Sequence, residues 1–188
     1  MRYQLLPPWG RVGWPATLVA VAAVAFVLVA VAAASGVRVN GTPSLPRGLY
    51  VASAFDPARA RRGDLVAACP DTVAVRRLGR YWTDGECPGG PDRPGGVRPL
   101  AKALAGLPGD TVRVTRSGVT FGRVRLARSA PLAADRLGRP VRPALGVHVL
   151  APGEYWLHSG RVPTSVDSRY AGPVRDVRAR LRPLWTED

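Results

Sequence analysis

The residue with the clearest capacity for chemistry in this 188-residue chain is Lys102, its only lysine. The remaining 26 of the 27 basic residues are arginine, so arginine serves wherever a positive charge alone is needed. An arginine keeps its proton at any accessible pH, whereas burial can neutralise a lysine ammonium and turn it into a base. Lys102 is therefore a candidate general base.

Ser44 stands in a Pro-rich turn, and from spacing alone it is explained equally well as a polar turn residue or as a nucleophile for such a base. A serine hydroxyl is a weak nucleophile unless a neighbouring group takes its proton, and a neutral amine can do this without a histidine. A lysine stays neutral near pH 7 only in an apolar setting, and its neighbours Ala101, Ala103, Leu104 and Ala105 are apolar. Four motifs occur in order: TPSLPRGLY from Thr42, RGDLVA from Arg62, KALAGLPGDTV from Lys102 and PGEYWLHSGRVPTSVDSRYAGPV from Pro152.

The order and spacing of these motifs resemble the signal peptidase family, closest to its conjugative-transfer (TraF-like) branch, from about Asn40 to Trp185. The resemblance implies that Ser44 is the nucleophile and Lys102 its base. It also implies that the Thr42 hydroxyl and the Ser44 backbone N–H form an oxyanion hole, where the loss of one donor typically costs about 10²–10³ in rate.

The last motif contains the S-x-D-x-R pattern of that family as Ser165, Asp167 and Arg169. The resemblance implies that Ser165 orients the Lys102 amine and that Asp167 and Arg169 pair to hold the loop. A plain structural ion pair is compatible with this interpretation.

The chain departs from the family pattern at Leu45, at Ala103 and at the segment 158–160, His-Ser-Gly, where secretory members often have Gly-Asp-Asn. A Ser-His-Asp triad built on His158 and Ser159 is rejected. The chain has no G-x-S-x-G elbow, and adjacent residues of an extended segment point to opposite faces.

Cys69 and Cys87 are the only cysteines. In an exported domain a disulfide is favoured over two free thiols, and a bridge across this loop contributes about 3 kcal/mol. The conjugative-transfer branch has a similar CP…CPGG arrangement between the second and third motifs. Because His148 and His158 lie far from the cysteines, the sequence predicts no metal site, and it predicts no cofactor.

The elements expected to position these residues are mostly strands. Runs rich in β-branched or alternating apolar residues predict strands near Leu49, Asp64 and Asp110, after Gly118 with a turn at Ser117 and Gly118, and from Val174. Pro- and Gly-rich segments at 85–96 and 131–143 predict exposed loops. The fold class is therefore mostly β, and the resemblance implies a coiled β-sheet catalytic domain following one N-terminal transmembrane helix.

Residues 16–37 carry no charge and no proline and would span roughly 33 Å as a helix, enough to cross a bilayer. Arg2 and Arg11 precede this run and favour a cytoplasmic N-terminus. The predicted organisation is a cytoplasmic segment 1–15, a signal-anchor helix 16–37 and an exported catalytic domain 38–188. A cleavable signal peptide with its processing site near Ala32 and Ala34 is the alternative.

The net charge of +14 comes from arginines scattered along the chain rather than from a dense tract. No nucleic-acid motif emerges, and a basic surface beside anionic lipid headgroups is favoured.

The predicted protein is a single-pass cell-membrane serine endopeptidase that cleaves membrane-inserted preproteins or pilin-like precursors after small residues. Whether the product ends are hydrolysed or joined stays open. The rival hypotheses are a non-catalytic, membrane-tethered basic β domain that binds lipid or a secretion-system partner, and a self-cleaving repressor-like peptidase.

Overall fold

The computed structural model describes residues 14–91 and 93–187 of the chain. The chain divides into two compact units between Val37 and Arg38. The first contains the N-terminal helix, and the second contains both β-sheets and all of the candidate site residues.

Helix α1 (Trp14–Ala34) is apolar around its whole circumference. Its segment Trp14–Val31 is long and apolar enough to cross a membrane by length and composition, a criterion that a signal sequence also meets. The helix begins two residues before the expected segment and ends three residues before its end. Arg2 and Arg11, on which the expected orientation rests, lie outside the described residues.

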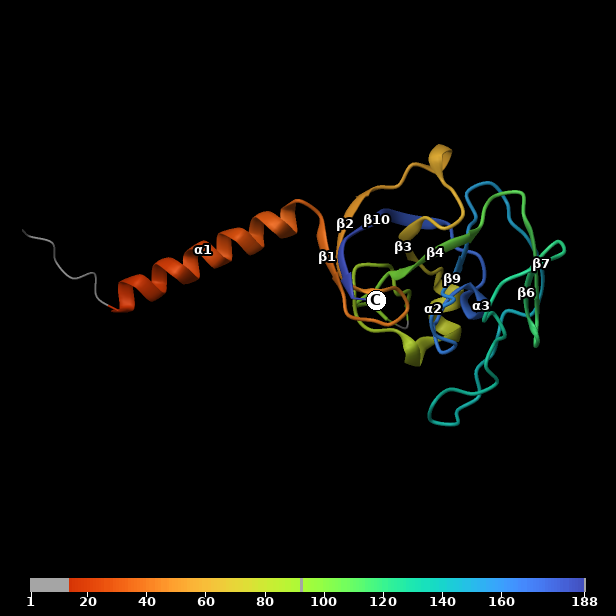
Figure 1. Cartoon of the computed structure of the whole chain (residues 1–188). Coiled ribbons are helices and arrows are strands. Elements are labelled where there is room, and N and C mark those ends of the chain that lie inside the picture. Colours follow the sequence, from red (N-terminus) through yellow and green to blue (C-terminus); the bar gives the residue numbers. More distant parts are fainter. Residues whose placement is uncertain (1–13, 92, 188) are drawn as a thin grey trace, which may run out of the picture. The chain divides into compact units, whose positions relative to one another are not determined.

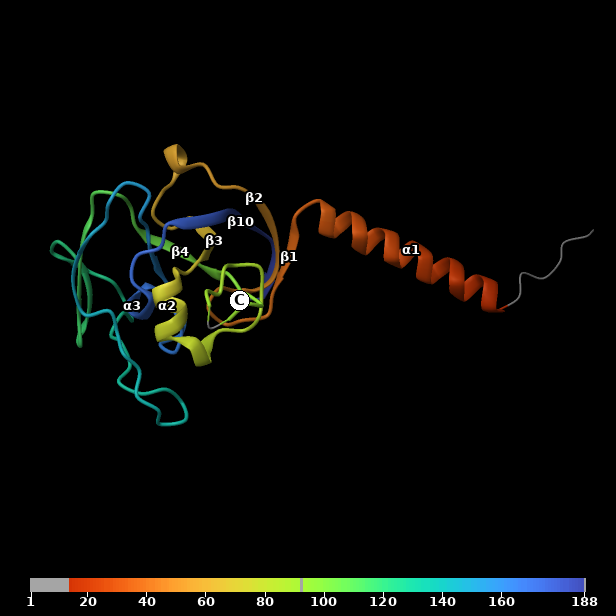
Figure 2. The same ribbon diagram turned by 180° about the vertical axis from the view of Figure 1, so that it is seen from behind.

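The larger sheet of the second unit has six strands in the order β1-β2-β10-β3-β4-β9 (Figures 1 and 2). The long strand β10 pairs antiparallel with both β2 and β3, so the C-terminal segment lies in the middle of the sheet. The strands are β1 (Val37–Asn40), β2 (Arg47–Ala54), β3 (Leu65–Cys69), β4 (Leu100–Gly106), β9 (Trp156–His158) and β10 (Asp176–Glu187).

The smaller sheet has four strands in the order β7-β6-β5-β8. Residue Thr115 pairs with Gly118, so Arg116 and Ser117 form the hairpin turn and Gly118 is the first residue of the next strand. The expected turn is thus displaced by one residue. The strands are β5 (Thr111–Thr115), β6 (Gly118–Phe121), β7 (Val124–Arg125) and β8 (Gly146–Val149).

The main hydrophobic core packs one face of β3 and β4 against α2 (Thr72–Arg77) and α3 (Ser168–Ala171). Because strand residues alternate between faces, Val66 and Ala68 of β3 point into this core together with Leu100 and Leu104 of β4. The described residues also form two single-turn 3₁₀ helices, η1 (Pro57–Arg59) and η2 (Gly79–Tyr81).

The mostly β fold class is confirmed, and each predicted strand run forms a strand. Helix α2 was not expected; Asp71 begins it by accepting a 2.6 Å hydrogen bond from the Ala74 backbone N–H. The expectation of an exposed loop at 85–96 is wrong at Cys87, Gly89 and Gly96, which are buried. The Cys87 side chain is buried because the Cys87 backbone pairs with that of Val97 and its sulfur forms a disulfide with the buried Cys69.

Candidate active site

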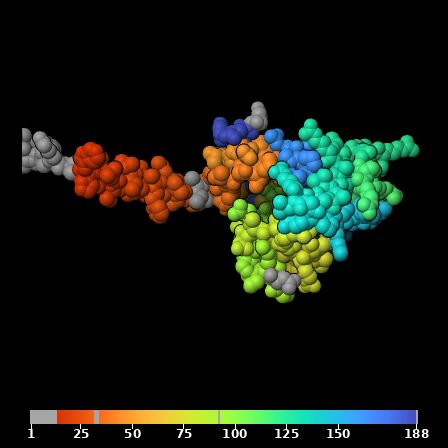
Figure 3. Space-filling model, turned by 90° about the horizontal axis from the view of Figure 1, so that it is seen from below, coloured from red at the N-terminus to blue at the C-terminus, as the bar shows by residue number. Residues whose placement is uncertain are grey.

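A cleft of about 840 Å³ on the β domain contains both residues of the predicted dyad. Ser44, Lys102 and Ser165 all line it. Figure 3 shows a hollow between the orange segment that contains residues 40–55, the yellow-green segment that precedes β4 and the teal segment near residue 135. Chain segments that are far apart in sequence therefore build one site.

Ser44 is held in a loop between β1 and β2 whose shape depends on Asn40. The Asn40 amide nitrogen donates to the backbone carbonyls of Thr42, Leu45 and Pro46 at 3.0, 3.2 and 3.0 Å. The Asn40 amide oxygen accepts from the Thr42 N–H at 3.1 Å, which is an Asx turn. The Asn40 side chain thus fixes both ends of the loop that contains Ser44.

Ser44 is 9% exposed, and its hydroxyl contacts a second serine from the last motif. The Oγ atoms of Ser44 and Ser165 lie 3.1 Å apart, and either can donate. A further serine, Ser159, donates from its hydroxyl to the Ser44 backbone carbonyl at 2.6 Å. The segment that follows β9 therefore contacts both the hydroxyl and the backbone of the candidate nucleophile.

Lys102 projects from β4 on the same face as Leu100 and Leu104 and is 6% exposed. Its sequence neighbours Ala101 and Ala103 project to the opposite face, because side chains alternate along a strand. They therefore do not provide the apolar surroundings of Lys102 that the sequence predicts. Among the residues that the structure describes, Lys102 Nζ has one hydrogen-bond partner, the Ala101 carbonyl at 3.0 Å.

Burial lowers the pKa of Lys102 from its ordinary value of 10.5 to about 8. The Asp167 carboxylate acts in the opposite direction and the Arg169 guanidinium adds to the lowering. At pH 7 a lysine with this pKa is neutral in about one molecule in ten, against roughly one in three thousand for an ordinary lysine. The site can therefore supply a neutral amine at ordinary pH.

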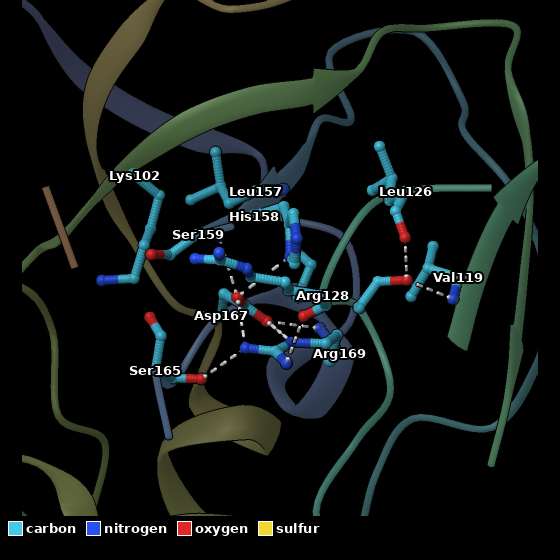
Figure 4. A network of polar contacts seen from close by, with 12 residues as sticks. Lys102, Val119, Leu126, Arg128, Leu157, His158, Ser159, Ser165, Asp167 and Arg169 are labelled. Carbon is cyan, nitrogen blue, oxygen red and sulfur yellow. Dashed lines mark hydrogen bonds and ion pairs between the residues drawn. The ribbon is translucent and has the colours of Figure 1, made fainter. Parts of the chain in front are cut away.

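The expected Asp167–Arg169 pair is present and has no exposed surface. Arg169 Nε lies 2.8 Å from Asp167 Oδ1 and Arg169 Nη2 lies 3.0 Å from Asp167 Oδ2, a bidentate geometry (Figure 4). Asp167 also accepts from the Ser159 backbone N–H at 3.0 Å, and Arg169 Nη2 donates to the Ser165 carbonyl at 3.1 Å. The pair thus holds both serines that contact Ser44.

Burial by itself raises the pKa of Asp167, but the contacts with His158 and Arg169 outweigh it and leave this pKa below its ordinary value. Asp167 therefore stays ionised inside the fold. His158 Nδ1 lies 3.3 Å from Asp167 Oδ2 without a well-directed hydrogen bond, and its Nε2 lies 3.1 Å from the Ala127 carbonyl. Since the Ser159 hydroxyl is directed at Ser44, His158 and Ser159 do not act as a nucleophile–base pair.

Thr42, the second predicted oxyanion donor, lies at the cleft and is exposed. Its hydroxyl donates to Asn40 Oδ1 at 2.8 Å. To donate to a substrate oxyanion it would have to leave that partner, so the Thr42 assignment stays a prediction.

The two Gly-Asp motifs lie at one end of β3 and β4 and are joined by an ion pair. Arg62 Nη2 donates to both carboxylate oxygens of Asp110 at 2.5 and 2.7 Å. Asp64 accepts from Arg180 Nη2 at 2.6 Å, which connects the same end of the sheet to β10. These motifs therefore brace the strand that carries Lys102.

Cys69 and Cys87 form a disulfide, as expected. Cys69 ends β3, and Cys87 lies in the segment whose residues 83–86 form part of the cleft wall. The disulfide thus fastens one wall of the cleft to the central sheet.

The protein-family model described as "Signal peptidase, peptidase S26" matches residues 11–181 of this chain. That match covers most of the chain and includes every residue of the site. The chain belongs to the signal peptidase family. It is thus placed in a family of peptidases on grounds independent of the cleft geometry.

Curated relatives of this signal peptidase family member carry conjugation names. "Conjugal transfer protein TraF" of Agrobacterium tumefaciens (strain 15955) is 37% identical over 164 residues, covering 85% of this chain and 88% of the relative. "Plasmid transfer protein TraF" of Escherichia coli is 34% identical over 175 residues, covering 89% and 93%. "Probable conjugal transfer protein TraF" of Sinorhizobium fredii (strain NBRC 101917 / NGR234) is 37% identical over 143 residues, covering 74% and 70%.

Sequence reasoning missed two polar residues of the site, Asn40 and Ser159. Asn40 precedes a glycine and a Thr-Pro pair, which is a usual setting for an Asx turn, so its role had a readable local signal. Ser159 had none, because its partner Ser44 lies 115 residues away.

Proposed function

We propose that this member of the signal peptidase family is a membrane-anchored serine endopeptidase in which Ser44 is the nucleophile and Lys102 the general base. The observation that carries the proposal is the burial of the only lysine, with a pKa of about 8, in the cleft that also holds Ser44. A domain that only bound lipid or a partner would gain nothing from burying its single lysine.

The proposed reaction has two halves. The neutral Lys102 amine accepts the Ser44 proton as Ser44 Oγ bonds to the substrate carbonyl carbon, and the Ser44 N–H stabilises the oxyanion. The Lys102 ammonium then gives its proton to the leaving amine as the peptide bond breaks, which leaves an acyl ester on Ser44. A water molecule, deprotonated by Lys102, attacks that ester; as the ester bond breaks, the Lys102 ammonium returns the proton to Ser44 Oγ and the second product is released.

The proposed substrates are membrane-inserted preproteins or pilin-like precursors cleaved after small residues. Family membership and the conjugation names of the relatives support this class. Helix α1 supports tethering, because an anchored enzyme and an anchored substrate diffuse in one plane and meet at a fixed depth.

Cleavage of a membrane-inserted precursor by purified variants tests the proposal. Ser44→Ala removes the nucleophile and is expected to abolish cleavage. Ser53→Ala is the matched control, because Ser53 is an exposed serine on the neighbouring strand β2 and lies outside the cleft. Cleavage by Ser44→Ala at the wild-type rate would refute the proposal.

The proposed orientation places the N-terminus in the cytoplasm and the β domain outside it. A reporter fused after Asp188 that works only outside the cytoplasm is expected to be active. Activity of a reporter that works only in the cytoplasm would refute this orientation.

A further inference from the structure

A second cavity of about 300 Å³ lies beside the catalytic cleft and takes no part in the proposed reaction. One wall comes from the segment 131–143, through Leu132 and Val141, and the other from Leu78, Tyr81 and Tyr170. These walls are mostly apolar. A preformed apolar hollow of this kind is a usual feature of a binding subsite.

The second cavity is continuous with the cleft. Tyr81, Arg136, Thr164 and Val166 line both of them. Ser165 stands between the last two of these residues, and its hydroxyl lies 3.1 Å from Ser44 Oγ. The second cavity therefore opens beside Ser44, on the side of the cleft where Ser165 lies, within reach of a polypeptide bound along that side.

The segment 131–143 is held in place by hydrogen bonds. Its Asp135 carboxylate accepts from Tyr81 Oη at 2.9 Å and Arg139 Nε at 2.7 Å, and from the backbone N–H groups of Leu137 and Arg139 at 2.9 and 3.0 Å. At its start, the Leu132 backbone N–H donates to Tyr170 Oη at 2.9 Å. The cavity is thus preformed, and binding needs little reorganisation.

The charges on the cavity wall also restrict the occupant. Asp135 is occupied by four donors within the fold, so it is not available to bind a cationic ligand group. The charge of Arg139 is paired with that of Asp135, so Arg136 leaves the wall with a net positive charge, which repels a lysine or arginine of the substrate. The remaining surface suits one uncharged apolar side chain.

We propose that this second cavity is a substrate subsite, which binds one leucine- or phenylalanine-sized side chain of the polypeptide whose backbone lies in the catalytic cleft. The inference rests on the proposed peptidase function and adds to it a second sequence requirement. Successive side chains of an extended peptide point to opposite sides, so the neighbours of the bound residue point away, and a cavity of about 300 Å³ holds a single side chain of this size.

The test uses the full chain in detergent and a set of precursors that keep small residues before the scissile bond. At each other position within five residues of that bond, alanine is replaced in turn by leucine or phenylalanine. The wild-type enzyme is expected to show, at one position, a roughly tenfold to hundredfold higher kcat/KM for the larger residue.

Ala134 also lines the cavity, so Ala134→Trp fills it and is expected to abolish that preference while the all-alanine precursor is still cleaved. Ala133→Trp is the matched control, because Ala133 is the exposed neighbour that does not line the cavity; it is expected to keep the preference. Val141→Ala enlarges the cavity and is expected to shift the preference toward tryptophan, which decides the matter if Ala134→Trp does not fold.

The absence of a preference at every position, or a preference that survives in Ala134→Trp, would overturn the subsite. Neither result touches the proposed function as long as the all-alanine precursor is cleaved and Ser44→Ala is inactive. Cleavage by Ser44→Ala would instead overturn the peptidase proposal itself.

Discussion

Ser159 donates a hydrogen bond of 2.6 Å from its hydroxyl to the backbone carbonyl of Ser44. The Ser159 backbone N–H in turn donates to Asp167, which is held by Arg169. The buried ion pair is therefore connected through a single residue to the candidate nucleophile. We infer that Ser159 positions Ser44, although it does not touch a reacting atom.

Ser159→Ala is expected to lower kcat by roughly five- to thirtyfold, because the loss of one positioning hydrogen bond is worth about 1–2 kcal/mol. KM is expected to change little, since Ser159 is not among the residues that line the cleft. Steady-state cleavage of a membrane-inserted precursor measures both constants.

Ser129→Ala is the control for Ser159→Ala. Ser129 is equally buried and also makes two hydrogen bonds, to the Leu126 carbonyl and from the Val119 N–H, but it lies outside the cleft. The Ser129→Ala variant is expected to be less stable than the wild type and to keep the wild-type kcat. If both variants lost kcat equally, the effect would be structural and Ser159 would have no specific positioning role.

Reduction of the Cys69–Cys87 disulfide is expected to lower the free energy of unfolding by about 3 kcal/mol, because the bridge closes a loop across a sequence separation of 18 residues. Activity is expected to fall as well, since the bridged segment forms a wall of the cleft. Thermal unfolding and cleavage with and without reductant measure the two effects. In the Cys69→Ser, Cys87→Ser double variant the reductant should change neither quantity; an effect there would show that it acts elsewhere.

Lys102→Met is expected to be inactive yet more stable than the wild type at pH 7. The folded pKa of about 8 lies below the ordinary value of 10.5, so burying the ammonium costs stability. That cost is complete below pH 8 and disappears above pH 10.5, and it amounts to roughly 3 kcal/mol at most.

Guanidinium unfolding of both proteins at pH 7 and at pH 10.5 measures the stability difference. The gain from Lys102→Met is expected at pH 7 and should shrink toward zero at the higher pH. A variant that is less stable than the wild type at pH 7 would contradict the burial argument.

Much of the fold could be read from the sequence because β2, β3 and β10 carry apolar residues at strand spacing. β4 was not anticipated, because Lys102 occupies one of its inward positions and alanines fill its outward ones, which hides the alternation. Helix α2 has six residues, too few to show a helical period.

The candidate site divides in the same way. Ser44 and Lys102 could be found because a single lysine and a family-like motif order are visible in the chain. The contacts of Ser159 and the second cavity depend on which distant segments meet, and no local pattern encodes that.

The pH dependence of cleavage follows from the neutral form of Lys102. Below a pKa of about 8 the neutral fraction falls tenfold for each pH unit, so kcat/KM is expected to rise with pH and to level off above about pH 8. Rates for the wild-type enzyme between pH 5.5 and pH 9.5, taken in roughly half-unit steps, measure this limb. A rate independent of pH across that range would show that no group with this pKa controls the reaction.

The replacement of Lys102 by arginine is the decisive variant, because arginine keeps a cationic side chain at this position but cannot give up its proton to act as a base. The measurement is cleavage of a membrane-inserted precursor by Lys102→Arg, beside the wild type and Ser44→Ala. We expect no cleavage by Lys102→Arg, and we expect a Ser44→Ala, Lys102→Arg double variant to be hardly worse than either single variant, since the two residues act as one unit. Near-normal cleavage by Lys102→Arg would contradict the serine–lysine mechanism and favour a tethered binding domain.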